Sequence, residues 1–188
     1  MRRRALFLLL PLVLAGCGYN SIQTYDETAA KAKQDIEVQL QRRADLIPNL
    51  VNTVKGFAAQ EQEVLTKVTE ARAGLSGAIK GGKMPEMADA NQQLTGALSR
   101  MMVTVEAYPT LKSDQNFLQL QDELTGTENR VAVARKDYNE AVGTYNAYIR
   151  KFPQVMTAKM TGAKSREYFE VSNAAAREAP TVDFGKKP

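Results

Sequence analysis

The sequence contains no histidine and only one cysteine, Cys17. Without histidine there are no Ser-His or Cys-His nucleophile pairs, no imidazole zinc sites and no usual general base near neutral pH. A single cysteine cannot form an intrachain disulfide. If Cys17 is acylated, its sulfur also cannot act as a thiolate nucleophile. The remaining carboxylates, lysines, tyrosines and serines match no catalytic motif. We therefore expect no enzyme activity, no catalytic residue, no metal site and no cofactor.

A basic surface for nucleic acid is also missing. The chain has 25 Lys and Arg against 21 Asp and Glu, but three of its arginines precede Cys17. Removing residues 1–16 leaves 22 basic against 21 acidic residues, so the remaining 172 residues are nearly neutral. Such a balance gives no reason to expect nucleic-acid binding, and the length suits one domain with a core of its own. No glycine-rich phosphate loop, cysteine cluster or convincing strand period occurs.

What the sequence does contain first is a leader. Three arginines at positions 2–4 precede an apolar run, 5–13, that is broken only by Pro11. This run is too short for the roughly 20 residues of a spanning helix, but it is typical of a secretory signal. The small residues Ala15 and Gly16 before Cys17 resemble the lipobox of bacterial lipoproteins. That resemblance implies a signal peptide over residues 1–16 and a lipid-modified N-terminus at Cys17.

Acyl chains on Cys17 would hold the protein on a membrane without crossing it, because two or more chains anchor stably where one does not. The alternatives are an ordinary signal peptide with an incidental cysteine, or a short buried helix. Gly18 follows Cys17 where an aspartate would favour retention at the inner membrane. We therefore expect a lipid-anchored protein that faces the periplasm, at the outer membrane if the host has two membranes.

After a polar tether over residues 17–21, apolar residues recur at helical spacing from Ile22 to about Ala73, with Asn20 or Ser21 as the expected N-cap. Pro48 interrupts this pattern and removes a backbone donor from the Ala44 carbonyl. No loop-like cluster flanks the proline, so the pattern predicts a kink or a tight corner and leaves both open. The expected replacement donors for the Ala44 carbonyl are Asn49, Arg42 and Arg43.

Further helices follow in the second half of the chain. Gly74, Gly77, Gly81 and Gly82 predict a break, and Pro85 then begins a helix that ends at Tyr108-Pro109. Methionines on this helix are interpreted as core residues rather than as a ligand surface. Ser113 is the expected cap of a long helix over 114–151, whose two seven-residue rows are Phe117, Leu124, Val131, Tyr138, Tyr145 and Phe152, and Leu120, Thr127, Ala134, Ala141 and Tyr148.

The two rows favour a bundle within one chain over an intermolecular coiled coil, because the other helices offer enough apolar surface to cover them. A short helix is expected over 154–160, and the segment Tyr168-Phe169-Glu170-Val171 is expected to dock on the bundle. The bundle thus covers residues 22–175, and the tail over 176–188 is expected to be extended.

Several stretches together resemble the LemA family. They are residues 43–51 (RADLIPNLV), 108–112 (YPTLK), Tyr138-Asn139 with Tyr145-Asn146, and Phe152-Pro153, with the tail stretch 180–184 (PTVDF) as a weaker addition. The resemblance implies an all-α, antiparallel up-and-down bundle. Many members of the family resemble one another in beginning with a single membrane-spanning helix. This chain differs from them because it begins with the stretch that resembles a lipobox. The family offers no settled catalytic mechanism or ligand, so the resemblance implies no active-site residues.

Two local hypotheses follow from these stretches. In the first, the bend at Pro48 displays Arg43 and Asp45, near Asn49, to a partner; its alternative is that Arg43 and Asp45 close a structural ion pair. The other hypothesis concerns Asn139 and Asn146, which are two helical turns apart. They could form a polar ladder for a ligand, or their side chains could bond to groups of a neighbouring helix. We expect that they bond to a neighbouring helix.

The sequence therefore predicts a membrane-anchored lipoprotein that acts as a non-enzymatic interaction or scaffold bundle in the cell envelope. Its expected partners are membrane lipid, through the acyl chains on Cys17, and an envelope protein that the sequence does not identify. An alternative function is a carrier that holds an apolar ligand between helices lined by methionines and tyrosines. A carboxylate-dependent hydrolase is a third possibility, disfavoured by the lack of paired acids.

Overall fold

The structure, a computed structural model, describes the backbone of residues 2–171 and the side chains of residues 18–171. The 176–188 tail and the side chain of Cys17 lie outside the described residues. Within residues 2–171 the elements are α1 (Arg2–Phe57), α2 (Gln62–Gly81), α3 (Met84–Val105), α4 (Pro109–Lys112), α5 (Gln115–Tyr148) and α6 (Gln154–Thr161). This part of the chain contains no strand.

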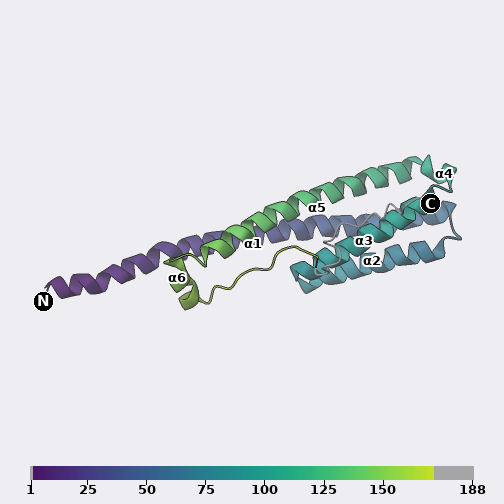
Figure 1. Cartoon of the computed structure of the whole chain (residues 1–188). Coiled ribbons are helices and arrows are strands. Elements are labelled where there is room, and N and C mark those ends of the chain that lie inside the picture. The colour runs from purple at the N-terminus through teal and green to yellow at the C-terminus, as the bar shows by residue number, and fades with distance from the viewer. Residues whose placement is uncertain (1, 172–188) are drawn as a thin grey trace, which may run out of the picture.

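The two long helices α1 and α5 lie side by side and run in opposite directions (Figure 1). The hairpin of α2 and α3 covers one half of this pair, while α6 covers the other end (Figure 1). After α6 the chain continues as an extended segment, residues 163–171, which we call the strap. The predicted all-α antiparallel bundle is therefore confirmed.

The core follows the predicted spacing of apolar residues. Along α1 the buried positions are seven residues apart at first and then mostly three or four apart, at Ile22, Ala29, Ile36, Leu40, Arg43, Ala44, Ile47, Leu50 and Val54. On α5 the first seven-residue row is buried from Phe117 to Tyr145. Phe152, the last member of that row, is wrong as a core residue: it lies beyond the end of α5 and is 83% exposed.

The first break lies within the stretch from Ile22 to about Ala73, where the spacing predicted a helix with a kink or corner only at Pro48. α1 continues through Pro48 to Phe57, and residues 58–61 form the turn into α2. Pro48 is exposed, so its ring faces away from the core. A tight corner at Pro48 is therefore wrong, because the packed helix on either side holds the backbone helical through that position.

The carbonyl that Pro48 deprives of its donor finds one on another helix. Nε of Arg72, from α2, donates to the Ala44 oxygen at 3.2 Å. The expected donors Asn49, Arg42 and Arg43 are not the ones used. A lost helical hydrogen bond has thus been replaced by a tie between α1 and α2.

Replacing Pro48 by alanine should stabilise the protein. Proline in a helix interior is about 3 kcal/mol less favourable than alanine, although its loss also frees the unfolded chain by about 0.4–1 kcal/mol. We expect Pro48→Ala to raise the free energy of unfolding by about 2 kcal/mol in urea titrations, and Asn52→Ala, one turn further along the exposed face, to change it by a few tenths. An unchanged or lowered stability of Pro48→Ala would show that the contact from Arg72 already offsets the cost of the proline in this helix.

Only one of the four glycines in the expected break ends a helix. Gly74 and Gly77 lie inside α2, and Gly82 alone has the left-handed conformation, with φ of 70°. Its N–H donates to the carbonyls of Ala78 and Ile79, as is typical of a glycine that closes a helix. The methionines of the next helix are core residues, as predicted: Met84, Met87 and Met101 are buried.

The helix α5 ends at Tyr148, three residues before the predicted end, and its N-cap also differs from the prediction. Asp114, rather than Ser113, caps the helix, because its carboxylate accepts the Phe117 N–H at 2.9 Å. The Ser113 hydroxyl instead donates to the carbonyls of Pro109 and Thr110. α6 begins at Gln154 as predicted. Phe169, in the strap, is buried in the main core, which confirms the predicted docking of this segment.

The N-terminal side of α1 is helical without interruption. The predicted tether over 17–21 and the helix start at Asn20 or Ser21 are wrong, since α1 begins at Arg2 and runs through these residues. Polar residues alone do not end a helix that is already propagating, and no proline stands at this point. Within the described part of the chain, no helix has both the length and the hydropathy needed to cross a bilayer. Cleavage before Cys17 stays a prediction.

Candidate functional site

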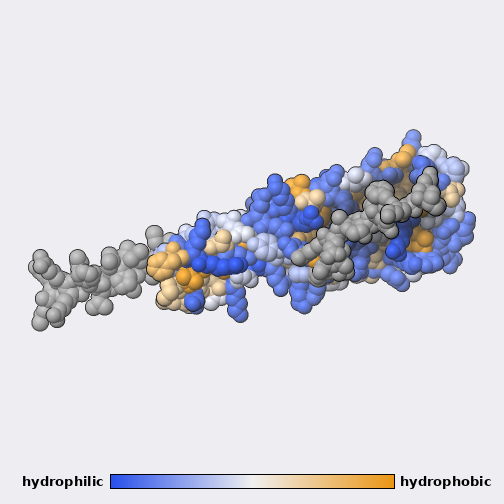
Figure 2. All heavy atoms as spheres, viewed as in Figure 1, coloured by the Kyte–Doolittle hydropathy of each residue, from blue (hydrophilic) through white to orange (hydrophobic). Residues whose placement is uncertain are grey.

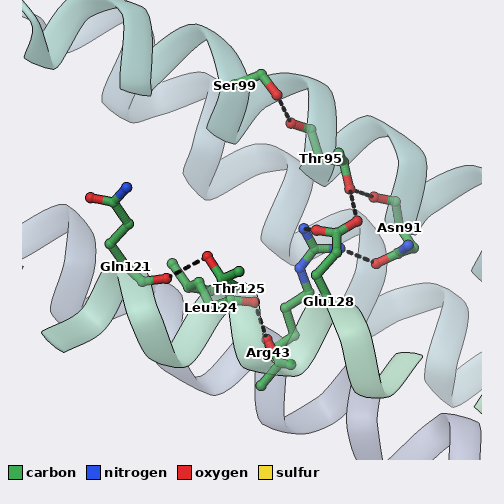
Figure 3. A network of polar contacts seen from close by, with 9 residues as sticks. Arg43, Asn91, Thr95, Ser99, Gln121, Leu124, Thr125 and Glu128 are labelled. Atoms are coloured by element: carbon green, nitrogen blue, oxygen red, sulfur yellow. Dashed lines mark hydrogen bonds and ion pairs between the residues drawn. The ribbon is translucent and has the colours of Figure 1, made fainter. Parts of the chain in front are cut away.

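A buried arginine lies where α1, α3 and α5 meet. Arg43 is 2% exposed, the largest fully buried side chain that the structure describes. Its Nη1 donates to Oδ1 of Asn91 at 2.6 Å, and its Nη2 forms an ion pair with Glu128 (Figure 3). The other carboxylate oxygen of Glu128 accepts from the Thr95 hydroxyl at 3.4 Å. We call these four residues the polar junction.

The electrostatics of the polar junction fit a structural tie. Burial lowers the pKa of the Arg43 guanidinium, and the charge of Glu128 opposes that shift. An arginine stays protonated in proteins even so, and therefore cannot act as a general base. Nε of Arg43 has no hydrogen-bond partner among the described residues, so this charge depends on Glu128 and Asn91 for its stabilisation.

Both hypotheses about Arg43 are wrong. The side chain cannot be displayed to a partner, because it points into the bundle. It also does not pair with Asp45, which is exposed and accepts a hydrogen bond from Nε2 of Gln41 at 2.7 Å. Arg43 falls on the apolar stripe of α1, whereas Asp45 lies two residues further on and faces away. Asp45, Pro48 and Asn49 share the exposed face of α1.

The two asparagines on α5 hold the strap. Asn146 accepts from the Arg166 N–H at 2.9 Å and donates to the Arg166 carbonyl at 2.9 Å. Asn139 does the same for Phe169, accepting at 2.9 Å and donating at 3.4 Å. Each side-chain amide thus pairs with both backbone groups of one strap residue, as a neighbouring β-strand would.

The spacing of these contacts follows from the geometry of the two segments. Seven helical residues rise about 10.5 Å, and three extended residues cover about 10 Å. Asn139 and Asn146 are seven residues apart, and their partners Phe169 and Arg166 are three apart in the opposite direction. The strap therefore runs antiparallel to α5, and the expectation that the asparagines bond to a neighbouring helix is wrong.

Two further contacts fix the strap on the helices. The Tyr138 hydroxyl, on a buried side chain, donates to the Glu167 carbonyl at 2.7 Å. The Arg166 guanidinium donates to both carboxylate oxygens of Asp26 on α1, at 2.8 and 3.0 Å, and lies 5.9 Å from the centre of the Tyr145 ring. We call Tyr138, Asn139, Asn146 and the Asp26–Arg166 pair the strap clamp.

The Asp26–Arg166 pair should make stability depend on pH in the acid range. The Arg166 hydrogen bond lowers the pKa of Asp26 below its ordinary value of about 3.9. The pair therefore stabilises the folded chain fully above that value and loses its effect as pH falls through the lowered pKa. We expect Asp26→Asn to cost about 1 kcal/mol at pH 7, because the pair is partly exposed, and the difference from the native chain to shrink below pH 4.

Urea titrations at pH 7, 5 and 3 would measure this difference. Asp122→Asn, on the exposed face of α5, is the matched control and should show no such trend. A cost of Asp26→Asn that stays constant from pH 7 to pH 3 would contradict the role of the ion pair.

The described grooves do not resemble a carrier site lined by methionines and tyrosines. One open groove of about 460 Å³ lies between α2 and α3, lined by Val64, Lys67, Glu70, Ala71, Gln93, Gly96, Ala97 and Arg100. A second, of about 260 Å³, borders the polar junction and includes Met102 as its one methionine. The described tyrosines line none of these grooves, and the described residues contain no group of three or more potential metal ligands.

Sequence reasoning missed Glu128, Asn91, Asp26 and Arg166 as partners. One signal was available: Arg43 stands within the buried series Ile36, Leu40, Ile47 and Leu50, so its burial follows from spacing alone. A second was the seven-residue separation of the asparagines, which matches three residues of an extended segment. The identity of each partner depends on which helices meet.

Comparison with known proteins finds a matching family and several relatives. The family model described as "LemA family" matches residues 32–184, a range that holds both the polar junction and the asparagines of the strap clamp. The protein is 33% identical to Magnetosome protein MamQ 2 of Paramagnetospirillum magneticum and 32% identical to Magnetosome protein MamQ of Magnetospirillum gryphiswaldense, over 81% and 80% of this chain and 64% of each relative. It is 25% identical to Protein LemA of Metamycoplasma hominis, over 71% of this chain and 60% of the relative.

The chain thus matches less than two thirds of the length of these curated relatives. Cys17 and the leader lie before the first residue of the family match. With a match over most of the chain and relatives above 30% identity, this protein belongs to the LemA family.

Proposed function

We propose that this protein is a membrane-anchored lipoprotein whose bundle acts as a non-enzymatic interaction or scaffold element in the cell envelope. The observation that carries the proposal is the continuity of α1 from Cys17 to Phe57, without a break between this cysteine and the bundle. Cys17 stands in this helix just before the bundle begins. A lipid on Cys17 would therefore hold the bundle by one end.

The length of the bundle suits such a role. From Gly18 to Phe57, α1 covers about 60 Å at 1.5 Å per residue. Because no flexible linker separates Cys17 from the helix, the far end would stand at a set distance from the lipid surface. We place the protein on the periplasmic side, and at the outer membrane in a host with two membranes, because glycine rather than aspartate follows Cys17.

A non-enzymatic role agrees with the polar groups of the described residues. Two of their ion pairs, Arg43 with Glu128 and Asp26 with Arg166, each hold two segments of the chain together. Perturbed titrating groups often mark catalytic sites, but structural ion pairs perturb them too, and here each has a structural partner. The relatives named as magnetosome proteins suggest work within a larger assembly, which we extend to this chain as part of the proposal.

A partner-facing surface is available on the outer side of α1. Asp45, Pro48 and Asn49 are exposed there, opposite the face that packs on α5 and α2. Pro48 has no backbone N–H, and its rigid ring is exposed on this face. We propose this face, near the far end of the bundle, as the contact for an envelope protein.

The anchoring part of the proposal is tested on the full chain expressed in a bacterial host with two membranes. We expect the mature native protein to begin at Cys17, to carry the mass of the acyl groups and to sediment with membranes after carbonate washing. Cys17→Ser should carry no acyl mass, while Ser21→Ala should behave as the native chain. An intact leader, or a mature chain with an unmodified sulfur, would overturn the proposal.

The partner-facing part needs its own readout. A photoreactive residue placed at Asn49 should give a discrete crosslinked product in whole cells, and one placed at Leu118, exposed on α5, should not. The product should disappear when Asp45 is replaced by lysine, because charge reversal beside the contact disfavours docking. Identical labelling patterns at both positions would contradict a specific contact at this face.

A further inference from the structure

One end of the bundle carries an excess of positive charge. No aspartate or glutamate occurs between Glu140 and Glu167, a stretch that contains Arg150, Lys151, Lys159, Lys164 and Arg166. Arg166 is neutralised by Asp26. The other four are exposed, and none takes part in an ion pair within the described residues. On the adjoining part of α1, residues 18–30 contain two acids, Asp26 and Glu27. Because Asp26 pairs with Arg166, only Glu27 remains to offset the four exposed basic residues.

The same end exposes large apolar side chains. Phe152 is 83% exposed, Met156 57% and Met160 82%, although Ala158, on the opposite side of α6, is buried. Met156 and Met160 are four residues apart and therefore share one outward face of α6, and Phe152 is exposed in the turn just before this helix. Figure 2 shows apolar atoms gathered at the place that α6 occupies in Figure 1, whereas polar residues cover most of the visible surface beyond it. Single exposed apolar residues are ordinary, but three within residues 152–160, two of them on α6 and one just before it, form a patch.

The position of α6 connects this patch to the start of the bundle. α6 packs on the first part of α1 through a small cluster of Ile22, Tyr145, Ile149 and Ala158. Gly18 approaches it so closely that a Cβ at this position would stand 3.3 Å from Cγ of Gln154. Because Gly18 follows Cys17, α6 lies beside the residue that is proposed to carry the lipid.

We propose that the outer face of α6 docks on a leaflet that contains anionic phospholipid. Phe152, Met156 and Met160 insert among the headgroups, and Lys151, Lys159 and Lys164 contact the lipid phosphates. This combination of an apolar face with flanking lysines is typical of helices that lie in a membrane interface. The inference rests on the proposed anchoring at Cys17 and adds a second contact, which fixes the tilt of the bundle on the leaflet.

The test places a reporter on α6 in the mature, full chain purified from membranes. Met160→Cys is labelled with an environment-sensitive fluorophore and reconstituted in nanodiscs that hold one chain each, so that no second copy can cover the patch. Val103→Cys is the control, since Val103 is 75% exposed at the α4 end of α3. In discs with phosphatidylglycerol, we expect position 160 to shift to the blue and to lose quenching by acrylamide, and position 103 to remain quenched.

Charge is tested in the same background. Each lysine near an anionic surface contributes about fivefold to binding, so Lys151→Gln, Lys159→Gln and Lys164→Gln together should restore full quenching at position 160. These lysines form no described ion pair, so the thermal melt should not change. Equal quenching at positions 160 and 103, or equal protection in discs of pure phosphatidylcholine, would overturn the docking proposal.

The parent chain, which has no added cysteine, distinguishes a failure of the proposed lipidation from a failure of the proposed docking of α6. If Cys17 is acylated through its sulfur, the chain without an added cysteine should not react with the fluorophore. A labelled parent chain would overturn the proposed lipidation, whereas an unlabelled parent with a solvent-quenched position 160 would overturn only the docking of α6.

Discussion

Replacing Glu128 by alanine should lower the free energy of unfolding by about 3 kcal/mol. The substitution leaves the buried Arg43 charge with Asn91 as its remaining described partner. Removing one member of a buried ion pair typically costs 3–5 kcal/mol, and the lower end applies because the Glu128 side chain is 45% exposed. Glu128→Gln keeps an acceptor oxygen but loses the charge, so we expect about half the cost.

A double substitution separates the charge from the packing. Arg43→Met with Glu128→Ala removes both charges and keeps much of the apolar volume, so it should be more stable than Glu128→Ala alone. Asp122→Ala, exposed on the same helix, is the matched control. Urea titration by circular dichroism measures all four chains. Equal stability of Glu128→Ala and Asp122→Ala would show that the polar junction does not support the fold.

Replacing Asn146 by alanine should release the strap at Arg166 while the rest of the bundle stays folded. The side chain is 2% exposed, and its loss leaves a backbone N–H and a carbonyl of Arg166 without their partners. An unsatisfied group of this kind costs about 1–3 kcal/mol, so a local opening energy lower by about 2 kcal/mol corresponds to about thirtyfold faster amide exchange. Asn139→Ala should act in the same way at Phe169.

Hydrogen exchange resolves this local effect from a global one. We expect faster exchange at the amides of Arg166 and Phe169 and unchanged protection at buried positions of α1 such as Leu40 and Leu50. Asn129→Ala, exposed on α5 and without a described hydrogen bond, should leave the strap amides unchanged. A uniform loss of protection across α1 would mean that the strap folds as one unit with the bundle.

The strap clamp also bears on the proposed position of α6. The strap follows α6 directly, and Arg166 ties it to Asp26 on α1, close to the part of α1 that α6 covers. A strap released at Asn146 would leave α6 attached mainly through the small cluster with Ile22 and Ile149. Hydrogen bonds outside the patch thus help to hold the orientation that docking would need.

Helix formation and the choice of buried faces could be predicted from the sequence because they depend on local spacing. The apolar residues of α1 and α5 recur every three or four positions, and burying such a stripe is the main source of free energy for a bundle. The family resemblance rested on short stretches such as Tyr145-Asn146, and the match over residues 32–184 confirmed it. The burial of Arg43 followed from the same periodicity, although its chemistry pointed to the surface.

Turns and partners could not be predicted in this way, because they depend on contacts between distant segments. The chain stays helical through Pro48, where Arg72 of α2 replaces the missing donor, and turns instead at residues 58–61, where Gln60 and Glu61 bond to the Tyr108 hydroxyl. Asn139 and Asn146 have a spacing that suits a helix or an extended partner equally well. Only the return of the strap along α5 decided between them.

The sequence by itself determined the helical class and the buried stripes, because both depend on the spacing of apolar residues a few positions apart. It also determined the absence of histidine chemistry, because the composition contains no histidine. The tertiary structure alone decided that Glu128 neutralises Arg43 while Asn91 accepts a hydrogen bond from it, that the strap is held by two asparagines, and that Phe152, Met156 and Met160 remain uncovered. Each of these depends on which surfaces meet across the bundle. That outcome is set by the total free energy of packing rather than by any single stretch of the chain.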